Sequence, residues 1–274
     1  MSYKRVILVD LAALGMRSDN ESAQHNSDND TLLTHVLNQS SESALPTFHK
    51  LGLFNIYFDR DDDPDLQPIA TYGLTRTRSI VNKSCSGLRE MFDCSLSYRV
   101  SSVFEEVGKH SNSIVISRFM SYLFSQEHTR HLQVGNDQDA FAVLHHQLDK
   151  NKAGFFYLQV PSLQTDTEAN DFDGFTDALN EVDQQLKGVL EQLHPDDLLM
   201  VVSSRVGDNR SKDGFSTYKI LPVMIYNENL TPTHIAGKPY VCEVGGTVLA
   251  ALGLQDLVTS PKHNLLPQTQ VTVD

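Results

Sequence analysis

Residues 5–10, RVILVD, and the turn that follows over Leu11–Gly15 form the stretch that decides the fold. Four apolar residues in succession, three of them β-branched, are typical of a strand that is buried on both faces of a parallel sheet. Asp10 ends this predicted strand. Ligands of open α/β sheets bind outside the carboxyl ends of the strands, so Asp10 is the first candidate site residue.

The rest of the chain predicts further strands of this kind with helices between them. Apolar runs indicate buried strands at Ser113–Ser117, Gly154–Val160 and Leu198–Val202. An amphipathic pattern predicts a long helix over Phe172–Leu193. A strand, a long helix and a strand without a hairpin turn form a right-handed crossover unit. We therefore predict an α/β protein with one mostly parallel sheet, helices on both faces, and a single core domain over residues 1–260.

Four other segments are predicted from their local composition. The segment Pro161–Asp171 is predicted as a loop. Ile220–Tyr226 indicates another strand, and Pro222 near its start predicts an edge strand or a bulge. The polar residues 17–29 predict a loop over the carboxyl edge of the sheet, and residues 261–274 predict a polar tail.

The composition bounds the protein's compartment and partners. The 274 residues include 22 basic and 35 acidic side chains, a formal net charge of -13, which disfavours nucleic acid and anionic membranes as partners. Cys85, Cys94 and Cys242 show no CxxC spacing, so neither a disulfide framework nor a thiolate metal site is predicted. The first apolar run ends at Asp10, too early for a signal peptide, and we expect a cytoplasmic protein.

A second candidate site lies in residues 82–90, NKSCSGLRE. Ser84 stands at the predicted start of a helix, beside the backbone amides of Ser86 and Gly87. A hydroxyl in that position suits a nucleophile or a bound phosphate. Serine is also a common helix cap with a purely structural role. The pattern by itself leaves both interpretations open.

The order of these pieces resembles phosphopentomutase, a member of the alkaline phosphatase superfamily of metal-dependent phosphoryl-transfer enzymes, related to the cofactor-independent phosphoglycerate mutases. RVILVD is similar to that family's opening strand, which ends in a metal-binding Asp. SCSGLRE resembles its TMTGHWE stretch, in which the first Thr is the phosphorylated nucleophile. HPDDLLMVVSSRVGDN resembles DDLLIITADHGND, and YKILPVMIY resembles REYVPLLVY. The resemblance implies an alkaline-phosphatase-like three-layer fold.

The resemblance also implies a missing domain. The family inserts a cap domain between the nucleophile helix and the later strands. In this chain Asp93–Val100 alone joins those two parts. We therefore expect the cap to be absent, with its former insertion point near residues 93–100.

The family's site residues can be carried over one position at a time. Asp10 matches the first metal-binding Asp, although the Ser that follows it in the family is Leu11 here. Ser84 stands at the nucleophile position. The remaining metal-ligand positions hold other residues: Leu163, Glu168, Arg205, Val206, and Gly214 or Phe215. The resemblance therefore leaves Asp10 and Glu168 as the residual metal-ligand positions.

These replacements predict a pseudoenzyme. Two divalent ions activate the nucleophile in the family, and a serine hydroxyl without them is weak. Arg205 places a fixed positive charge where a cation should lie, which costs roughly 4 kcal/mol at an effective dielectric constant near 20. We therefore expect no cofactor and a binding or scaffold role.

The ligand of such a pseudoenzyme is predicted at the same edge. A phosphate or carboxylate would be bound by Arg205, Ser84, Ser86 and Gly87. The guanidinium of Arg205 would take the place of the metals. The alternative role of Arg205 is an internal salt bridge to Asp10. A protein partner or a second copy of the chain is also expected, because loss of the cap exposes this edge.

An enzyme with a rebuilt site is the second hypothesis. It would be a phosphatase or phosphotransferase that uses Ser84 or Cys85 as nucleophile. Hard oxygen ligands would suit one Mg²⁺ or Mn²⁺ ion. The acidic residues available for it are Asp10, Asp166, Glu168, Asp208 and Asp213.

Overall fold

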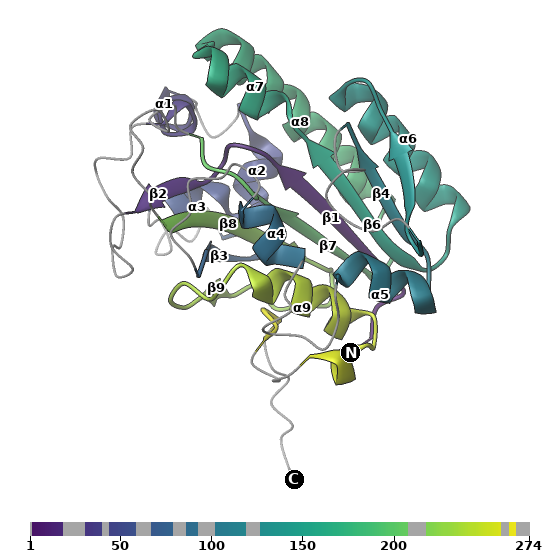
Figure 1. Cartoon of the computed structure of the whole chain (residues 1–274). Helices are drawn as coiled ribbons and strands as arrows, with labels where there is room; N and C mark the ends of the chain where they lie inside the picture. Colours follow the sequence, from purple (N-terminus) through teal and green to yellow (C-terminus); the bar gives the residue numbers. More distant parts are fainter. Residues whose placement is uncertain are drawn as a thin grey trace.

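The computed structural model describes residues 2–18, 31–39, 44–58, 67–78, 86–92, 102–118, 127–207, 218–258 and 263–266. Over these residues one sheet of nine strands runs through the centre of the molecule, in the order β5-β4-β6-β1-β7-β8-β3-β9, with β2 paired to β8 (Figure 1). The strands are β1 (Arg5–Leu11), β2 (Met16–Ser18), β3 (Thr71–Arg76), β4 (Ser113–Ser117), β5 (Arg130–Gln133), β6 (Gly154–Val160), β7 (Asp197–Val202), β8 (Tyr218–Tyr226) and β9 (His234–Ile235).

β1 is the middle strand of the parallel part of the sheet. All seven of its residues are buried, and β6 and β7 pair with it in parallel on either side. This register places Asp10 opposite Gln159 on one side and Val202 on the other. β4 and β5 extend the parallel part, whereas β8 is antiparallel to both β7 and β3. The predicted α/β class with a mostly parallel sheet is confirmed.

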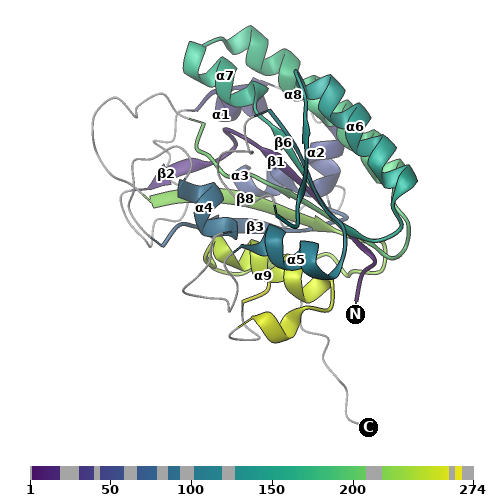
Figure 2. The same ribbon diagram turned by 45° about the vertical axis from the view of Figure 1, so that its right-hand side comes forward.

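Helices cover both faces of the sheet (Figures 1 and 2). One hydrophobic core joins the sheet to α1, α2, α3, α6, α7 and α8, and a second core on the other face joins it to α4, α5 and α9. The helices are α1 (Leu32–Gln39), α2 (Pro46–Leu51), α3 (Leu53–Phe58), α4 (Ser86–Phe92), α5 (Val103–His110), α6 (Asp137–Lys150), α7 (Ser162–Ala169), α8 (Phe172–Gln192) and α9 (Cys242–Ala251), followed by a 3-10 turn at Gln255–Leu257.

The alternation of β1 decides which face Asp10 occupies. Ile7 and Val9 belong to the core under α6 and α8, whereas Val6 and Leu8 belong to the core under α4, α5 and α9. Successive side chains of a strand point to opposite faces, so Asp10 shares the face of Val6 and Leu8. The candidate site therefore lies on the α4 face of the carboxyl edge.

The prediction of a loop over Pro161–Asp171 is wrong. Ser162–Ala169 forms α7, in which Leu163 is buried against the core and the Thr167 hydroxyl donates to the Leu163 carbonyl at 2.7 Å. The helix ends at Asn170, whose φ of 56° is left-handed, and Asp171 then caps α8 by accepting from the Gly174 amide. The polar sequence hid this helix because contact with α8, and not an apolar stripe of its own, holds it in place.

The prediction of an edge strand or a bulge at Pro222 is also wrong. β8 lies between β7 and β3, and its register with β3 runs without interruption through the pair Leu74 and Pro222. A proline removes one N–H donor and keeps its carbonyl, which here accepts from the Ser203 amide at 3.2 Å. β8 therefore stays inside the sheet.

Three predictions fall on residues outside the described ones. The expected loop over residues 17–29 is described at its first two residues alone, where β2 pairs with β8. The junction at residues 93–100 is not described, and the expected tail over residues 261–274 is described at 263–266. The absence of a cap therefore stays a prediction.

Candidate functional site at the carboxyl edge of the sheet

Asp10 lies near the carboxyl end of β1, and its carboxyl group is buried. Its exposed fraction is 0%. The Tyr157 hydroxyl donates to Oδ2 at 2.7 Å, and the Ser204 amide donates to Oδ1 at 2.8 Å. Burial raises the pKa of Asp10, while these hydrogen bonds and the nearby Arg205 charge act in the opposite direction. Each carboxylate oxygen therefore already has a donor from the protein.

Tyr157 is suited to remain that donor. Burial raises the pKa of its hydroxyl well above the ordinary value, and the negative charge of Asp10 raises it further. The hydroxyl thus keeps its proton at neutral pH and donates it to Asp10. Tyr157 comes from β6 and Ser204 follows β7, so both neighbours of β1 contribute to this contact.

The turn after β7 is locked against the turn after β1. The Gly15 amide and the Ser203 hydroxyl both donate to the Arg205 carbonyl, at 2.9 and 2.8 Å. A Cβ on Gly15 would lie 2.6 Å from that same oxygen, so the close approach requires glycine. Ala13, in the turn between β1 and β2, has a φ of 76°, a left-handed value that is unusual for alanine. The packing of these turns therefore fixes the backbone of Arg205.

Arg205 lies close enough to Asp10 for its charge to favour the ionised carboxylate. A salt bridge between them, the alternative role given for Arg205, is not among the ion pairs of the described residues, and the Asp10 oxygens accept from Tyr157 and Ser204 instead. Nε of Arg205 is buried and has no hydrogen-bond partner in the described part of the chain. One donor of this guanidinium is therefore unused at the edge.

The start of α4 approaches the same turn. A Cβ on Gly87 would lie 2.3 Å from the Ser204 carbonyl oxygen, so α4 packs against the backbone beside Arg205 at van der Waals distance. The fold thus brings Ser86 and Gly87 to the turn that carries Arg205 and contacts Asp10. Ser84 and Cys85 lie outside the described residues.

The other metal-ligand positions carried over from the resemblance do not complete a metal site in the described residues. Leu163 is 0% exposed and apolar, and Glu168 is exposed and accepts from Gln164 Nε2 at 2.8 Å. Within the described ranges, the one trio of side chains close enough to share a metal ion is Glu105, Glu127 and His128. The described residues at Asp10 therefore do not fit a two-metal centre, while Asp208, Asp213, Gly214 and Phe215 are not described.

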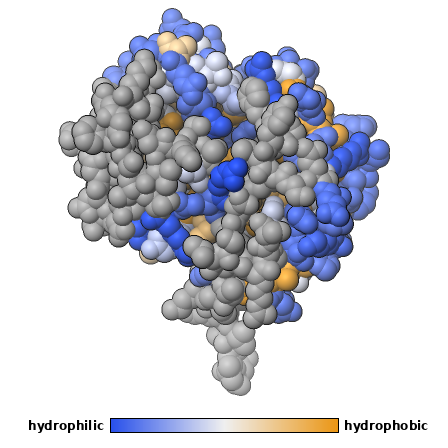
Figure 3. Space-filling model, in the orientation of Figure 1, coloured by the Kyte–Doolittle hydropathy of each residue, from blue (hydrophilic) through white to orange (hydrophobic). Residues whose placement is uncertain are grey.

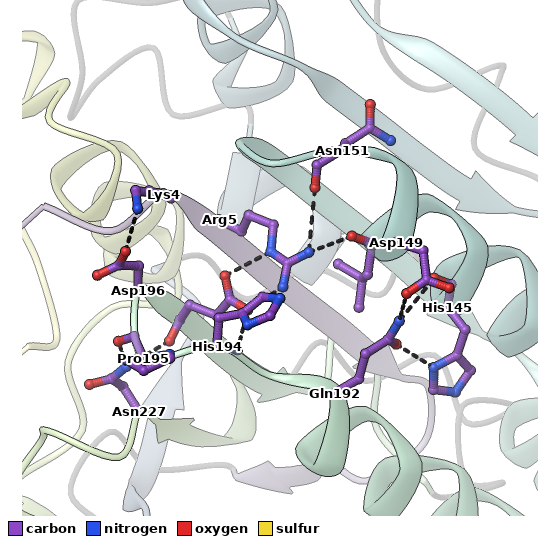
Figure 4. A network of polar contacts seen from close by, with 12 residues as sticks. Lys4, Arg5, His145, Asp149, Asn151, Gln192, His194, Pro195, Asp196 and Asn227 are labelled. Carbon is purple, nitrogen blue, oxygen red and sulfur yellow. Dashed lines mark hydrogen bonds and ion pairs between the residues drawn. The ribbon is translucent and has the colours of Figure 1, made fainter.

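The opposite, amino edge of the sheet holds a second polar network. Figure 4 shows Arg5 at its centre. Arg5 Nε donates to Asp197 Oδ1 at 2.7 Å, its second N–H group pairs with Oδ2, and a third donates to the Leu148 carbonyl at 2.5 Å. Both members of the ion pair are buried. This network joins β1, β7 and the end of α6, and the amino edge of a parallel sheet is not where α/β proteins bind ligands.

The described surface gives no large apolar patch. Figure 3 shows mainly hydrophilic residues with scattered hydrophobic areas. Among the described residues, Ile69 is the one large apolar side chain that is clearly exposed, at 38%. No helix in the described part of the chain is long and apolar enough to cross a membrane.

Comparison with solved structures finds similar folds at low sequence identity. The lipoteichoic acid synthase LtaP from Listeria monocytogenes matches with a TM-score of 0.53 at 12% identity, over 96% of this chain and 74% of that one. The alkaline phosphatase from the Antarctic bacterium TAB5 matches with a TM-score of 0.51 at 12% identity, over 93% and 99%. At such identities the likeness concerns the fold alone.

Comparison with curated sequences gives partial matches. A phosphopentomutase from Helicobacter pylori (strain Shi470) is 31% identical over 87 residues, which cover 32% of this chain and 21% of that protein. A phosphopentomutase from Clostridium kluyveri is 22% identical over 130 residues, 47% of this chain and 33% of that protein. The chain thus matches a fifth to a third of these relatives' length, and no protein-family model matches it.

The described residues thus have an alkaline-phosphatase-like fold, with a polar carboxyl edge at its centre. Part of the chain is similar in sequence to phosphopentomutases, the family that the sequence resemblance named.

Three residues of this edge escaped the sequence analysis. In the sequence, Tyr157 and Gln159 belong to an apolar strand pattern, and Ser204 to a predicted turn. The signal that could have found the first two is the pair of polar side chains at alternate positions near the end of an otherwise apolar strand. No local signal marks Ser204, because its backbone amide makes the contact.

Proposed function

We propose that this chain is a catalytically inactive relative of phosphopentomutase that binds a small phosphate-bearing molecule at the carboxyl edge of its sheet. The observation that carries the proposal is the enclosure of Asp10. Asp10 is 0% exposed and accepts hydrogen bonds from Tyr157 and Ser204, and no two further carboxylate, imidazole or thiol ligand atoms of the described residues lie close enough to share an ion with it. Asp10 then serves the fold as an internal acceptor.

Arg205 is the residue that we propose binds the anion. Its buried Nε has no partner among the described residues, and a guanidinium forms strong, charge-assisted hydrogen bonds to phosphate. The Ser86–Gly87 start of α4 lies against the same turn. A pentose phosphate is the first ligand to test, because the matched relatives are named phosphopentomutases.

The proposal extends to compartment and assembly. We expect a cytoplasmic location, because the spacing of the three cysteines indicates no disulfide framework. Self-association or a protein partner would use the edge that a missing cap leaves open. We expect neither nucleic acid nor an anionic membrane as a partner, because the net charge of -13 disfavours both.

Metal analysis tests the loss of catalysis first. The chain, purified without chelator, is expected to contain no stoichiometric metal and to give no heat on titration with Mn²⁺ or Mg²⁺. A tight site with one or two ions per chain would contradict the proposal. It would instead favour the enzyme with a rebuilt site. The next assay would then measure hydrolysis of a panel of phosphate esters with Mn²⁺ present, and Ser84→Ala should abolish that activity.

Calorimetry with ribose 5-phosphate and with inorganic phosphate tests the anion site. Arg205→Met should weaken binding by about tenfold or more, the effect of losing a charge-assisted contact. The matched control is Arg130→Met, which removes one exposed positive charge from β5 and should leave binding unchanged. Equal loss in both variants would mean that general charge, and not a site at Arg205, attracts the anion.

A further inference from the structure

Three side chains that can bind a metal ion meet beside α5, near the start of β5. Glu105 lies on α5, and Glu127 and His128 come just before β5. Each of the three offers one ligand atom, and these atoms all lie within 4.8 Å of one another. No other trio of carboxylate, imidazole or thiol groups in the described ranges meets this condition. A single ion could therefore contact all three side chains.

The packing of α5 holds these residues together. A Cβ on Gly108 would overlap the carbonyl oxygen of His128, so the helix and the backbone of His128 are in direct contact and this position requires glycine. Glu105 lies three residues before Gly108, and residues three apart share one face of a helix. The face of α5 that touches His128 therefore also carries Glu105.

A cation is already attracted to these carboxylates. Lys109 Nζ lies 4.0 Å from Glu105 Oε1. The pKa of Lys109 is raised chiefly by its hydrogen bond to Glu106, and the charges of Glu105 and Glu127 raise it further. The contact of Lys109 with Glu106, at 3.1 Å, is the shorter one. An ion that binds Glu105 thus leaves Lys109 its closer partner.

The imidazole of His128 indicates which cation fits the trio. Mg²⁺ and Ca²⁺ take oxygen ligands, whereas Zn²⁺ binds imidazole nitrogen together with carboxylate oxygen. Three protein ligands and a water molecule are a common coordination set for Zn²⁺. The side chain of His128 is exposed, and it makes no hydrogen bond or ion pair with another described residue. Its ring nitrogens are therefore available to an ion.

We propose that Glu105, Glu127 and His128 bind one Zn²⁺ ion, which joins the start of β5 to α5. The site lies near the amino edge of the sheet, whereas Asp10 and Arg205 lie at the carboxyl edge, so it does not depend on the proposed function. It is also separate from the acidic cavity of about 370 Å³ that α6, α7 and α8 enclose. No three described carboxylate, imidazole or thiol groups of that cavity lie close enough to share an ion.

The exposure of the ligands sets the expected strength of binding. Outer hydrogen bonds that orient metal ligands raise metal affinity, and no described residue orients the ring of His128 in this way. Glu127 is exposed as well. We therefore expect Zn²⁺ to exchange with solvent and to be removed by dialysis, so that the purified chain contains no stoichiometric metal.

Calorimetric titration of the dialysed full chain with Zn²⁺, in about 150 mM salt to screen surface attraction, tests this site. We expect one Zn²⁺ per chain. His128→Ala removes the nitrogen ligand and should weaken binding by at least about tenfold, the smallest loss typical of a residue that merely orients a ligand. His110→Ala is the matched control, because it removes an exposed histidine of α5 that pairs with Glu106 and should leave binding unchanged.

Lys109→Met provides a test in the opposite direction. It removes the ammonium group that competes for Glu105, and Zn²⁺ should bind more tightly. Lys187→Met removes the same charge from an exposed pair on α8 and should leave Zn²⁺ binding unchanged. Equal tightening in both variants would contradict the proposal, because it would mean general attraction by the acidic surface.

Three other outcomes would overturn the proposal. They are the absence of Zn²⁺ binding, equal weakening by His128→Ala and His110→Ala, and several Zn²⁺ ions per chain. A Zn²⁺ ion that is lost in Asp10→Asn and kept in His128→Ala would lie at the carboxyl edge. That result would contradict the proposed function as well, whereas loss in His128→Ala alone supports this site and leaves the proposed function intact.

Discussion

Asp10 shows how one buried carboxyl group links the stability of the fold to pH. Burial raises its folded-state pKa above the ordinary value of 3.8. The folded chain therefore holds this proton more tightly than the unfolded chain. The stabilising contribution of the neutral form is full below the unfolded pKa and is lost as the pH rises through the folded pKa.

Replacing Asp10 by Asn should remove this pH dependence. We expect the unfolding free energy of the wild type, relative to that of Asp10→Asn, to be most favourable below about pH 3.8 and to fall as the pH rises toward neutrality. Urea unfolding of both chains over that range measures it. Because other carboxyl groups are common to both chains, parallel pH profiles would show that Asp10 is not the titrating group.

At the scale of elements, α2 depends on a residue of α8 for its first turn. Leu45 offers no side-chain cap to α2, and the amides of Thr47 and Phe48 donate instead to the Asp183 carboxylate, at 3.2 and 2.7 Å. Asp183→Ala should lower the unfolding free energy by about 1–3 kcal/mol, since it leaves two buried amides without an acceptor. Denaturant unfolding measures the loss. Asp177→Ala, exposed on the same helix, should change stability little, and an equal loss there would contradict the capping role.

The Arg5 and Asp197 pair is the contact that joins β1, β7 and α6 at the amino edge. Arg5→Met should lower the unfolding free energy by about 3–5 kcal/mol, because it leaves a buried carboxylate without its partner. The neighbouring exposed pair of Lys4 and Asp196 supplies the control, and Lys4→Met should have no measurable effect. Thermal and urea unfolding measure both losses of unfolding free energy. Equal losses in Arg5→Met and Lys4→Met would contradict the special role of the buried pair.

For the whole molecule, the net charge of -13 should make stability depend on salt. Like charges on a compact acidic chain repel one another, and salt screens that repulsion. Raising the ionic strength from about 10 mM to about 150 mM shortens the screening length from roughly 30 Å to roughly 8 Å. We expect the urea midpoint to rise over this interval. A falling midpoint would mean that attractive ion pairs outweigh the repulsion.

The elements that could be predicted from sequence are those whose own residues are apolar enough to indicate burial. β1, β6 and β7 are apolar throughout because both of their faces are covered. β3 and β5 could not be predicted, because TYGLTR and RHLQ show no such run and depend on pairing with β8 and β4. The helix α7 was missed for a related reason, since its packing on α8 supplies what its polar sequence lacks.

The sequence by itself determined the class of fold, the phosphopentomutase resemblance and the position of Asp10 at the end of a buried strand. Those follow from local patterns that need no partner to be recognised. The tertiary structure alone decided that Asp10 accepts from Tyr157 and Ser204, residues 147 and 194 positions away, and that α6, α7 and α8 enclose an acidic cavity. The physical reason is that hydrogen bonds and cavities depend on strand register and helix packing, which bring together side chains that are distant in the chain.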